Sequence, residues 1–186
     1  MMSSHKALLI VDTQIDFCPG GSYPVPKGDE VVKPLNDALA YARKNNWKLF
    51  ASRDWHPLSV FNQDMSKAHC VQNTKGAEYH PLLNIQNDVE IISKGEDLSD
   101  AHYSAFNGDD KSLADLLRSA SITEVYIGGL ALEYCVKATA IDSARLGFTT
   151  FVFMDATRHI KQEKADSAIE QMTTAGIKFI KTTDLQ

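Results

Sequence analysis

The sequence predicts an α/β fold of three layers, α/β/α, in which helices cover both faces of a six-stranded, mostly parallel, Rossmann-like sheet. Short apolar runs alternate with longer stretches whose apolar residues recur at helical spacing. The apolar runs are continuous, which is typical of parallel strands that are buried on both faces. The chain has 186 residues, enough for a sizeable core, and we expect a single domain over residues 1–186.

The predicted elements follow from these patterns in chain order. Strands are expected at residues 7–11, 47–52, 89–93, 124–130, 148–154 and 177–181. Helices are expected at residues 29–46, 112–120, 133–146 and 164–176. Asp29 is a suitable N-cap for the first helix, and Gly176 can close the last. Residues 53–88 are long, polar and irregular, and such a segment inside a compact domain is usually functional or disordered.

Composition argues against several classes of function. The net charge is −5 and no cluster of lysine or arginine stands out, which argues against a nucleic-acid partner. The longest apolar run near the start, at residues 7–11, is too short for a signal-peptide core or a membrane span. We therefore expect a cytoplasmic protein with no membrane partner. In that reducing compartment Cys18, Cys70 and Cys135 should be free thiols.

Side chains that carry chemistry follow four of the predicted strands. Asp12 follows the first strand, Asp54 and His56 follow the second, Lys94 follows the third and Cys135 follows the fourth. Open parallel sheets bind ligands beyond the carboxyl ends of their strands. We therefore expect these side chains to meet at one edge of the sheet.

The first candidate cluster consists of Asp12, Lys94 and Cys135. A carboxylate at the end of a buried strand is costly unless it is paired, and the lysine and the thiol would satisfy it. Cys135 falls at the start of a predicted helix, where free N–H groups and the helix dipole favour the nucleophilic thiolate. A lone cysteine on a helix is more often a small buried apolar residue, so the nucleophile interpretation depends on its two partners.

The second candidate cluster consists of Asp54, His56 and His69. Residues two apart in an extended segment point to the same side, and His69 returns from the irregular segment. Two imidazoles and one carboxylate suit a divalent transition ion such as Zn²⁺, Fe²⁺ or Mn²⁺. We interpret the remaining histidines as structural or surface residues: His5, His80, His102 and His159.

Four ordered blocks of the sequence resemble nicotinamidases of the isochorismatase-like cysteine hydrolase family. The blocks are LLIVDTQIDFCPGGSYPVPKGDEVV, SRDWHP with HCVQNTKGAEYHP, SKGED with HYSAF, and GGLALEYCVKATAIDS. The resemblance covers nearly the whole length. It implies the fold of that family and hydrolysis of nicotinamide to nicotinate and ammonia through a cysteine thioester, a reaction of NAD salvage.

The resemblance also implies a role for individual residues. The catalytic triad would be Asp12, Lys94 and Cys135, and the ligands of one divalent metal ion would be Asp54, His56 and His69.

Further roles concern the substrate itself. The backbone N–H groups of Ala131 and Cys135 would form an oxyanion hole, next to a cis Leu130–Ala131 peptide bond. Phe17, Tyr103 and Ala131 would contact the substrate.

The sequence departs from the family pattern in three places. Ile15 occupies the position of an asparagine, residues 66–69 read SKAH where an aromatic residue and a proline often precede the histidine, and the loop after His56 lacks a second histidine. The fourth metal position is then left to water or to another side chain. Asp64, the only acid between His56 and His69, is the candidate for it.

Other functions stay open at this point. The chain could be an amidase of the same family acting on another small amide such as pyrazinamide, a catalytically silent binding member, or a metallohydrolase with an incidental thiol. The intact acid, lysine and cysteine set argues against the silent member, and the thiol's place between a strand and a helix argues against an incidental one. The pattern specifies neither the metal nor the oligomeric state, and a homo-oligomer is compatible with it.

Overall fold

The computed structural model describes residues 5–98 and 100–185 and has one six-stranded sheet at its centre. The strands are β1 (Lys6–Val11), β2 (Lys48–Asp54), β3 (Glu90–Lys94), β4 (Glu124–Leu130), β5 (Thr149–Arg158) and β6 (Lys178–Ile180). Their order is β3-β2-β1-β4-β5-β6, and all neighbours pair in parallel. This is the strand order of the Rossmann fold, so the predicted six-stranded, Rossmann-like sheet is confirmed.

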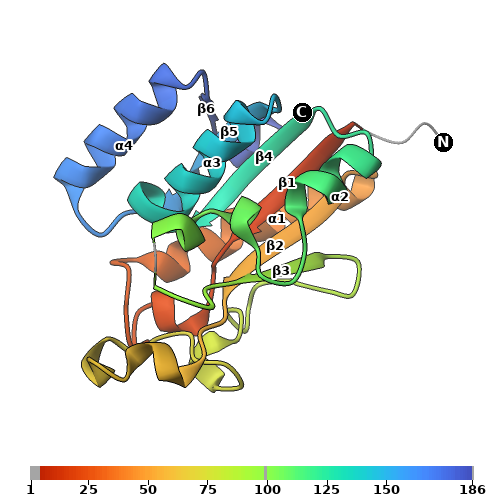
Figure 1. The fold of residues 1–186 in the computed structure, drawn as a ribbon. Coiled ribbons are helices and arrows are strands. Elements are labelled where there is room, and N and C mark those ends of the chain that lie inside the picture. Colours follow the sequence, from red (N-terminus) through yellow and green to blue (C-terminus); the bar gives the residue numbers. More distant parts are fainter. Residues whose placement is uncertain (1–4, 99, 186) are drawn as a thin grey trace.

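Helices cover the sheet on both faces (Figure 1). The α-helices among the described residues are α1 (Val32–Lys44), α2 (Leu113–Ser119), α3 (Lys137–Arg145) and α4 (Gln162–Thr174). Side chains of β1 alternate between two buried clusters, with Leu9 in the cluster of α2, α3 and α4 and Leu8 in that of α1. β1 is thus apolar on both faces, which explains its continuous apolar run, and the helices on both faces confirm the three predicted layers.

The helix α1 begins later than the sequence pattern indicates, and the prediction that Asp29 caps it is wrong. A 3₁₀ turn over Gly28–Val31 precedes the helix, and the cap position of α1 is Val31, which makes no side-chain capping bond. Pro34 supplies the reason. Its ring lacks an N–H, which is harmless in the first helical turn but would break a helix that had begun at Asp29.

The irregular segment predicted at 53–88 is present, apart from its first two residues, which complete β2. Between β2 and β3 the chain forms short 3₁₀ turns at Leu58–Phe61, Met65–Lys67 and Lys75–Ala77. Isolated bridges tie Gln14 to Tyr79 and His56 to Val71. This segment lies beyond the carboxyl end of β2, next to the residues that follow the strands (Figure 1).

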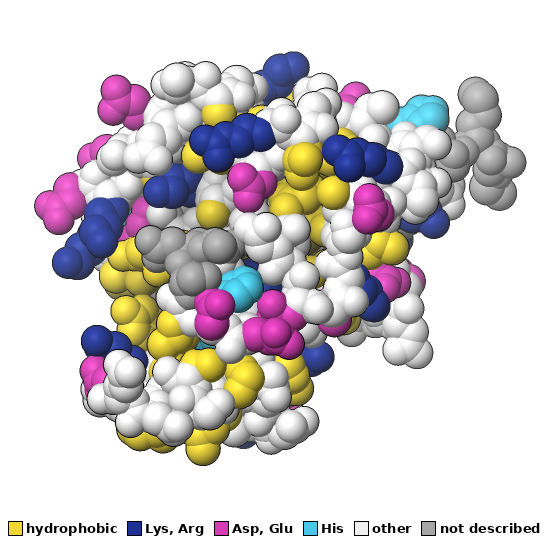
Figure 2. Space-filling view, in the orientation of Figure 1, with side chains coloured by type: hydrophobic (Ala, Val, Ile, Leu, Met, Phe, Trp, Pro, Cys, Tyr) yellow, Lys and Arg dark blue, Asp and Glu magenta, His cyan; other side chains and the backbone are white. Residues whose placement is uncertain are grey.

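The surface gives few further indications of function. On the face shown in Figure 2, lysine and arginine side chains are interspersed with acidic ones rather than gathered into one patch. Among the described residues, no helix combines the length and the apolar character that crossing a membrane requires.

Candidate active site

Asp12, Lys94 and Cys135 meet at the carboxyl edge of the sheet. Asp12 directly follows β1, Lys94 ends β3, and Cys135 lies in the turn after β4. All three are buried. The Nζ atom of Lys94 is 2.8 Å from Asp12 Oδ2 and 3.7 Å from Cys135 Sγ. The structure therefore brings together the three residues predicted as a catalytic triad.

Cys135 lies in a π-helical turn rather than in the first turn of an α-helix. The turn spans Leu132–Val136 and leads into α3, and the N–H of Val136 donates to the carbonyl of Ala131 at 3.2 Å. Turns of this type are frequent at functional sites. The Leu130–Ala131 peptide bond before the turn is cis, as the resemblance implies.

Burial and the charges of neighbouring groups together set the pKa values of this cluster. Burial raises the pKa of the Cys135 thiol well above its usual range, although the charge of Lys94 lowers it. It also raises the pKa of Asp12, again against the effect of Lys94. Burial lowers the pKa of Lys94, but the carboxylates of Asp12 and Asp54 outweigh it and hold that pKa well above its usual value. Burial thus favours the protonated thiol, which is consistent with a mechanism in which Asp12 accepts the thiol proton.

Asp12 holds one carboxylate oxygen that can accept a proton. Its Oδ1 accepts a 2.7 Å hydrogen bond from the hydroxyl of Ser52. Its Oδ2 lies beside the ammonium of Lys94 but accepts no hydrogen bond of good geometry from any residue in the described ranges. A buried acceptor without a donor is costly, and such atoms often mark a catalytic role. The arrangement suits a general base next to the thiol of Cys135.

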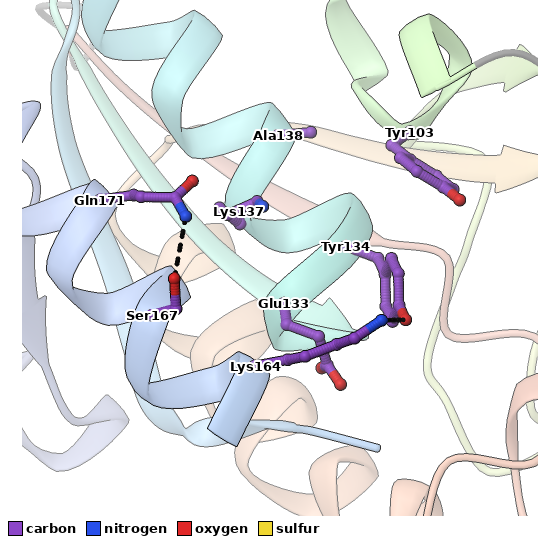
Figure 3. Close-up of a pocket in the computed structure, with 8 residues that line it drawn as sticks. All are labelled: Tyr103, Glu133, Tyr134, Lys137, Ala138, Lys164, Ser167 and Gln171. Atoms are coloured by element: carbon purple, nitrogen blue, oxygen red, sulfur yellow. Dashed lines mark hydrogen bonds between the residues drawn. The ribbon is translucent and has the colours of Figure 1, made fainter. Parts of the chain in front are cut away.

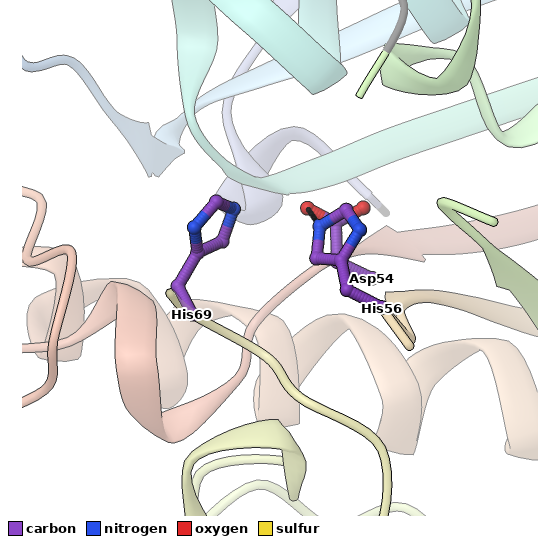
Figure 4. Close-up of side chains that lie close together, drawn as sticks. All are labelled: Asp54, His56 and His69. Atoms are coloured by element: carbon purple, nitrogen blue, oxygen red, sulfur yellow. Dashed lines mark ion pairs between the residues drawn. The ribbon is translucent and has the colours of Figure 1, made fainter. Parts of the chain in front are cut away.

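Asp54, His56 and His69 form a second cluster beside the first. In Figure 4 the carboxylate and the two imidazoles lie around a common space, and one donor atom from each is within 4.8 Å of the others. Asp54 Oδ2 is 3.6 Å from His56 Nε2. The other carboxylate oxygen of Asp54 pairs with Lys94, which links the two clusters.

The ring nitrogens of both histidines are arranged as in a metal site. The Nδ1 atom of His56 is 2.7 Å from the carbonyl oxygen of Gly95, and that of His69 is 2.7 Å from the carbonyl oxygen of Lys67. Because a carbonyl can only accept, each Nδ1 carries a proton, and in the neutral form of each ring the lone pair is then on Nε2, where it can bind a metal ion. Carbonyl partners of this kind orient histidines that bind metals.

The charges and the unpartnered atoms of this cluster also fit a metal ion. His56 Nε2 is buried and has no hydrogen-bond partner within the part of the chain that the structure describes. Burial raises the pKa of Asp54, but Lys94 and His56 outweigh it and keep that pKa below its usual range, so Asp54 stays ionised. Burial lowers the pKa of His69, which favours the neutral imidazole. An ionised carboxylate and neutral imidazoles are the forms that bind a divalent ion.

A second grouping of donor atoms does not suit a metal. Asp12, Asp54 and Cys135 also bring donor atoms within 4.8 Å of one another. The ammonium of Lys94, however, contacts all three side chains and already supplies the positive charge there. We therefore assign the candidate metal site to Asp54, His56 and His69.

Asp64 does not join these residues. It is exposed and caps the 3₁₀ turn Met65–Lys67, where its Oδ1 accepts the N–H of Ser66 at 3.1 Å. Its Oδ2 is 3.2 Å from the Nζ atom of Lys67. Since the carboxylate is already used by its own turn, the structure does not support the prediction that it is the fourth metal ligand.

A cavity of about 170 Å³ opens onto both clusters. Cys135, Asp54 and His69 contribute polar atoms to its wall. The remaining wall is mostly apolar or aromatic and consists of Phe17, Tyr23, Val25, Tyr103, Leu130, Ala131, Tyr134 and Ile160. The residues predicted to contact substrate, Phe17, Tyr103 and Ala131, therefore all line one cavity with the thiol.

A wider cavity of about 480 Å³ lies next to the first and is drawn in Figure 3. Tyr103 and Tyr134, whose ring centroids are 5.6 Å apart, line both cavities. Lys164 donates a 2.9 Å hydrogen bond to the hydroxyl of Tyr134 (Figure 3). No residue of either cluster lines the wider cavity. We therefore take the smaller cavity as the candidate substrate pocket.

Three residues that the sequence interpretation did not single out hold the clusters in place. Gln14 accepts the N–H of Asp54 at 2.8 Å and donates to the carbonyl of Asp54 at 2.7 Å. Ser52 donates to Asp12. Gly95 has φ of +101°, and a Cβ there would overlap the ring of His56. Each stands one or two residues from a predicted site residue in the sequence, and that proximity is the signal that could have identified it.

Comparison with known proteins shows the family of the chain. Residues 6–184 match the isochorismatase domain family. The nicotinamidase of Escherichia coli (strain K12) is 37% identical, with 92% of each chain covered. The nicotinamidase/pyrazinamidase of Mycobacterium tuberculosis (strain ATCC 25618 / H37Rv) is 35% identical over 94% of this chain and 98% of its own. The crystal structure of Pyrococcus horikoshii pyrazinamidase in complex with zinc has a TM-score of 0.88 at 38% identity, covering 96% of this chain and 99% of that one. The chain therefore belongs to the isochorismatase family.

Proposed function

We propose that the protein is a nicotinamidase, which hydrolyses nicotinamide to nicotinate and ammonia. The observation that carries this proposal is the lining of the small cavity. It contains the thiol of Cys135, which contacts Lys94, and two candidate metal ligands, Asp54 and His69. Lys94 in turn pairs with Asp12. The size and the aromatic lining suit a single planar ring. The choice of amide is supported by the nicotinamidases that cover nearly the whole chain.

Asp54, His56 and His69 would hold one divalent transition ion, either Zn²⁺, Fe²⁺ or Mn²⁺. When bound, such an ion supplies a Lewis-acidic position that accepts the lone pair of a ring nitrogen. The zinc complex of the Pyrococcus horikoshii relative makes zinc the first metal to test.

In the first half of the reaction, Asp12 accepts the thiol proton on its carboxylate while Cys135 Sγ attacks the amide carbon. The carbonyl oxygen becomes an oxyanion, and the backbone N–H groups of Ala131 and Cys135 would stabilise it. Burial raises the pKa of both Asp12 and Cys135, so the proton can move between them without a resting thiolate. Lys94 keeps its proton throughout and balances the carboxylates.

In the second half, Asp12 returns the proton to the amide nitrogen, the C–N bond breaks and ammonia leaves. A thioester then joins Cys135 to the acyl group. Asp12 accepts a proton from a water molecule that adds to the thioester carbon. The C–S bond breaks, Asp12 returns that proton to the thiol, and the acid product releases its own proton to the solvent and departs as nicotinate, which restores the starting state.

Ammonia release from nicotinamide tests the proposal. The wild-type protein and the Cys18→Ala variant, which lacks another buried thiol, should both release ammonia, and iodoacetamide should stop both. The Cys135→Ala variant should release none. A wild-type protein that is loaded with zinc and releases no ammonia would contradict the proposal.

Pyrazinamide is a second candidate substrate. A cavity that binds a ring nitrogen and a carboxamide would accept either nicotinamide or pyrazinamide. The Mycobacterium tuberculosis relative is named for both activities. Values of kcat/KM for the two amides, measured on the same zinc-loaded sample, would decide which of them the pocket prefers.

A further inference from the structure

We propose that Asp16 and Gly76 act together as a clamp that positions His69 as a metal ligand. The inference rests on the proposed metal site and extends it, because it concerns how the irregular segment presents its ligand. Neither residue lines the candidate substrate pocket or belongs to the two clusters. Both would be positioning residues rather than catalytic ones.

The carboxylate of Asp16 fixes the backbone next to His69. Its Oδ2 accepts the N–H of Cys70 at 2.7 Å. Cys70 follows His69 directly and has φ of +46°, a left-handed conformation that a residue with a side chain rarely adopts. The carbonyl of Cys70 accepts the N–H of His56 at 3.0 Å. One residue held by Asp16 therefore connects the backbones of both histidines.

Asp16 also holds the chain next to the aromatic rings around His69, through its carboxylate and its backbone carbonyl. Its Oδ1 accepts the N–H of Ser22 at 3.1 Å, and the carbonyl of Asp16 accepts the N–H of Tyr23 at 2.9 Å. The ring of Tyr23 is 5.1 Å from the ring of His69, between centroids. The ring of Phe17, the residue after Asp16, is 5.5 Å away. Asp16 thus anchors the chain on both sides of the imidazole.

Gly76 completes the clamp from the other side. A Cβ atom at this position would overlap the carboxylate of Asp16. The backbone of Gly76 does not have a positive φ. The reason for a glycine here is therefore the close approach to Asp16. An alanine would push the carboxylate away from its two N–H donors.

The chemistry at position 16 requires a carboxylate. Both of its oxygens face a backbone N–H, and an ionised carboxylate accepts at both. An asparagine has almost the same shape, but its NH₂ group would face one of the donors. The Asp16→Asn substitution therefore removes one hydrogen bond while leaving the volume nearly unchanged.

The expected effect is a loss of metal affinity. Residues that orient a metal ligand typically change the affinity by roughly 10–100-fold when they are substituted. Zinc dissociation constants would be measured by competition with a chelating dye, starting from metal-free protein. We expect Asp16→Asn and Gly76→Ala each to weaken binding within that range. We expect the double variant to bind no more weakly than the weaker single variant, because both changes act on one contact.

Two further measurements separate positioning from general folding. Asp64→Asn is the matched control, because Asp64 lies in the segment that carries His69 but its carboxylate bonds only to its own turn. The zinc affinity of this variant should equal that of the wild type. Thermal melts of the metal-free variants should match the melt of this control, and the alkylation rate of Cys135 should be unchanged.

Each alternative result has a definite meaning. Wild-type zinc affinity in Asp16→Asn or in Gly76→Ala would overturn the clamp. A weaker affinity with an equally lowered metal-free melt in both variants would show a general folding role and would also overturn it. No zinc binding by the wild-type protein would overturn the metal site and the clamp together. Failure of the wild type to release ammonia while the affinities follow the expected pattern would reject the proposed amidase activity and leave the clamp intact.

Discussion

The catalytic cluster and the candidate metal cluster are neighbours, but the fold positions them by different means. Asp12 and Lys94 stand at the ends of β1 and β3, and Cys135 stands in the turn after β4, so parallel register sets their separation. His69 instead comes from an irregular segment. Single hydrogen bonds hold it there, from its own ring to Lys67 and through Cys70 to Asp16.

Asp54 belongs to both arrangements. It ends β2 and pairs in register with Lys94, yet its second oxygen faces His56. Paired strands of the sheet thus position the acid–base centre, whereas His69 in the metal cluster depends on a few contacts outside the sheet. The two should therefore be separable by experiment.

The Cys135→Ala substitution should produce the largest effect. Loss of the nucleophile removes the covalent route, and we expect kcat to fall by at least about a thousandfold. Zinc affinity and the thermal melt should stay close to those of the wild type, because the thiol is outside the candidate metal cluster. Ammonia release and zinc titration on the same sample check this. Residual turnover near the wild-type rate would reject the nucleophile assignment.

The Lys94→Met substitution should cause the next largest effect, on stability. It leaves the buried carboxylates of Asp12 and Asp54 without their cation, which should cost about 3–5 kcal/mol of unfolding free energy. The control is Lys111→Met, which breaks an exposed pair with Glu90 and should cost no more than about 1 kcal/mol. Urea unfolding measures both. Equal costs for the two lysines would contradict the buried network.

Removal of the metal should affect binding more than thiol chemistry. After treatment with a chelator, KM for nicotinamide should rise by at least about tenfold, because a Lewis-acid contact is worth several kcal/mol. The alkylation rate of Cys135 should change much less, since its immediate partners are Asp12 and Lys94. Re-addition of zinc should restore the original KM. A parallel loss of alkylation would show that the two clusters are not separable.

The pH dependence of alkylation should reveal the effect of burial on the thiol. Burial raises the pKa of Cys135, so its thiolate fraction near neutral pH is lower than that of an ordinary cysteine. Iodoacetamide should then react slowly with the metal-free protein at neutral pH, and the rate should still be rising above about pH 9. The Cys135→Ala variant corrects for the other thiols, including Cys18, whose pKa burial raises to about 11. A rate that levels off below neutral pH would mean a resting thiolate.

The Asp64→Asn substitution should have the smallest effect. Its carboxylate is exposed and caps a short turn, so we expect unchanged zinc content after dialysis and unchanged KM for nicotinamide. Metal analysis and steady-state kinetics would measure these two quantities. A loss of zinc in this variant would restore Asp64 as a ligand and would mean that the segment rearranges when the metal binds.

The sequence alone determined the layers, the six strands and the identity of the residues in both clusters. These depend on local patterns, namely continuous apolar runs, helical spacing and polar residues at strand ends. Asp12, Lys94 and Cys135 could be predicted to meet because the carboxyl ends of parallel strands share one edge. The resemblance to a family supplied the roles of Phe17 and Tyr103, which local patterns could not.

Tertiary structure alone decided how these residues are charged, oriented and supported. The thiol of Cys135 rests protonated because segments distant in sequence bury it, and desolvation then outweighs the charge of Lys94. Asp64 faces its own turn rather than the metal cluster, and Asp16 holds Cys70 from 54 positions away in the sequence. Local patterns carry no information on such contacts, since burial and hydrogen bonding across the chain arise only when the segments pack together.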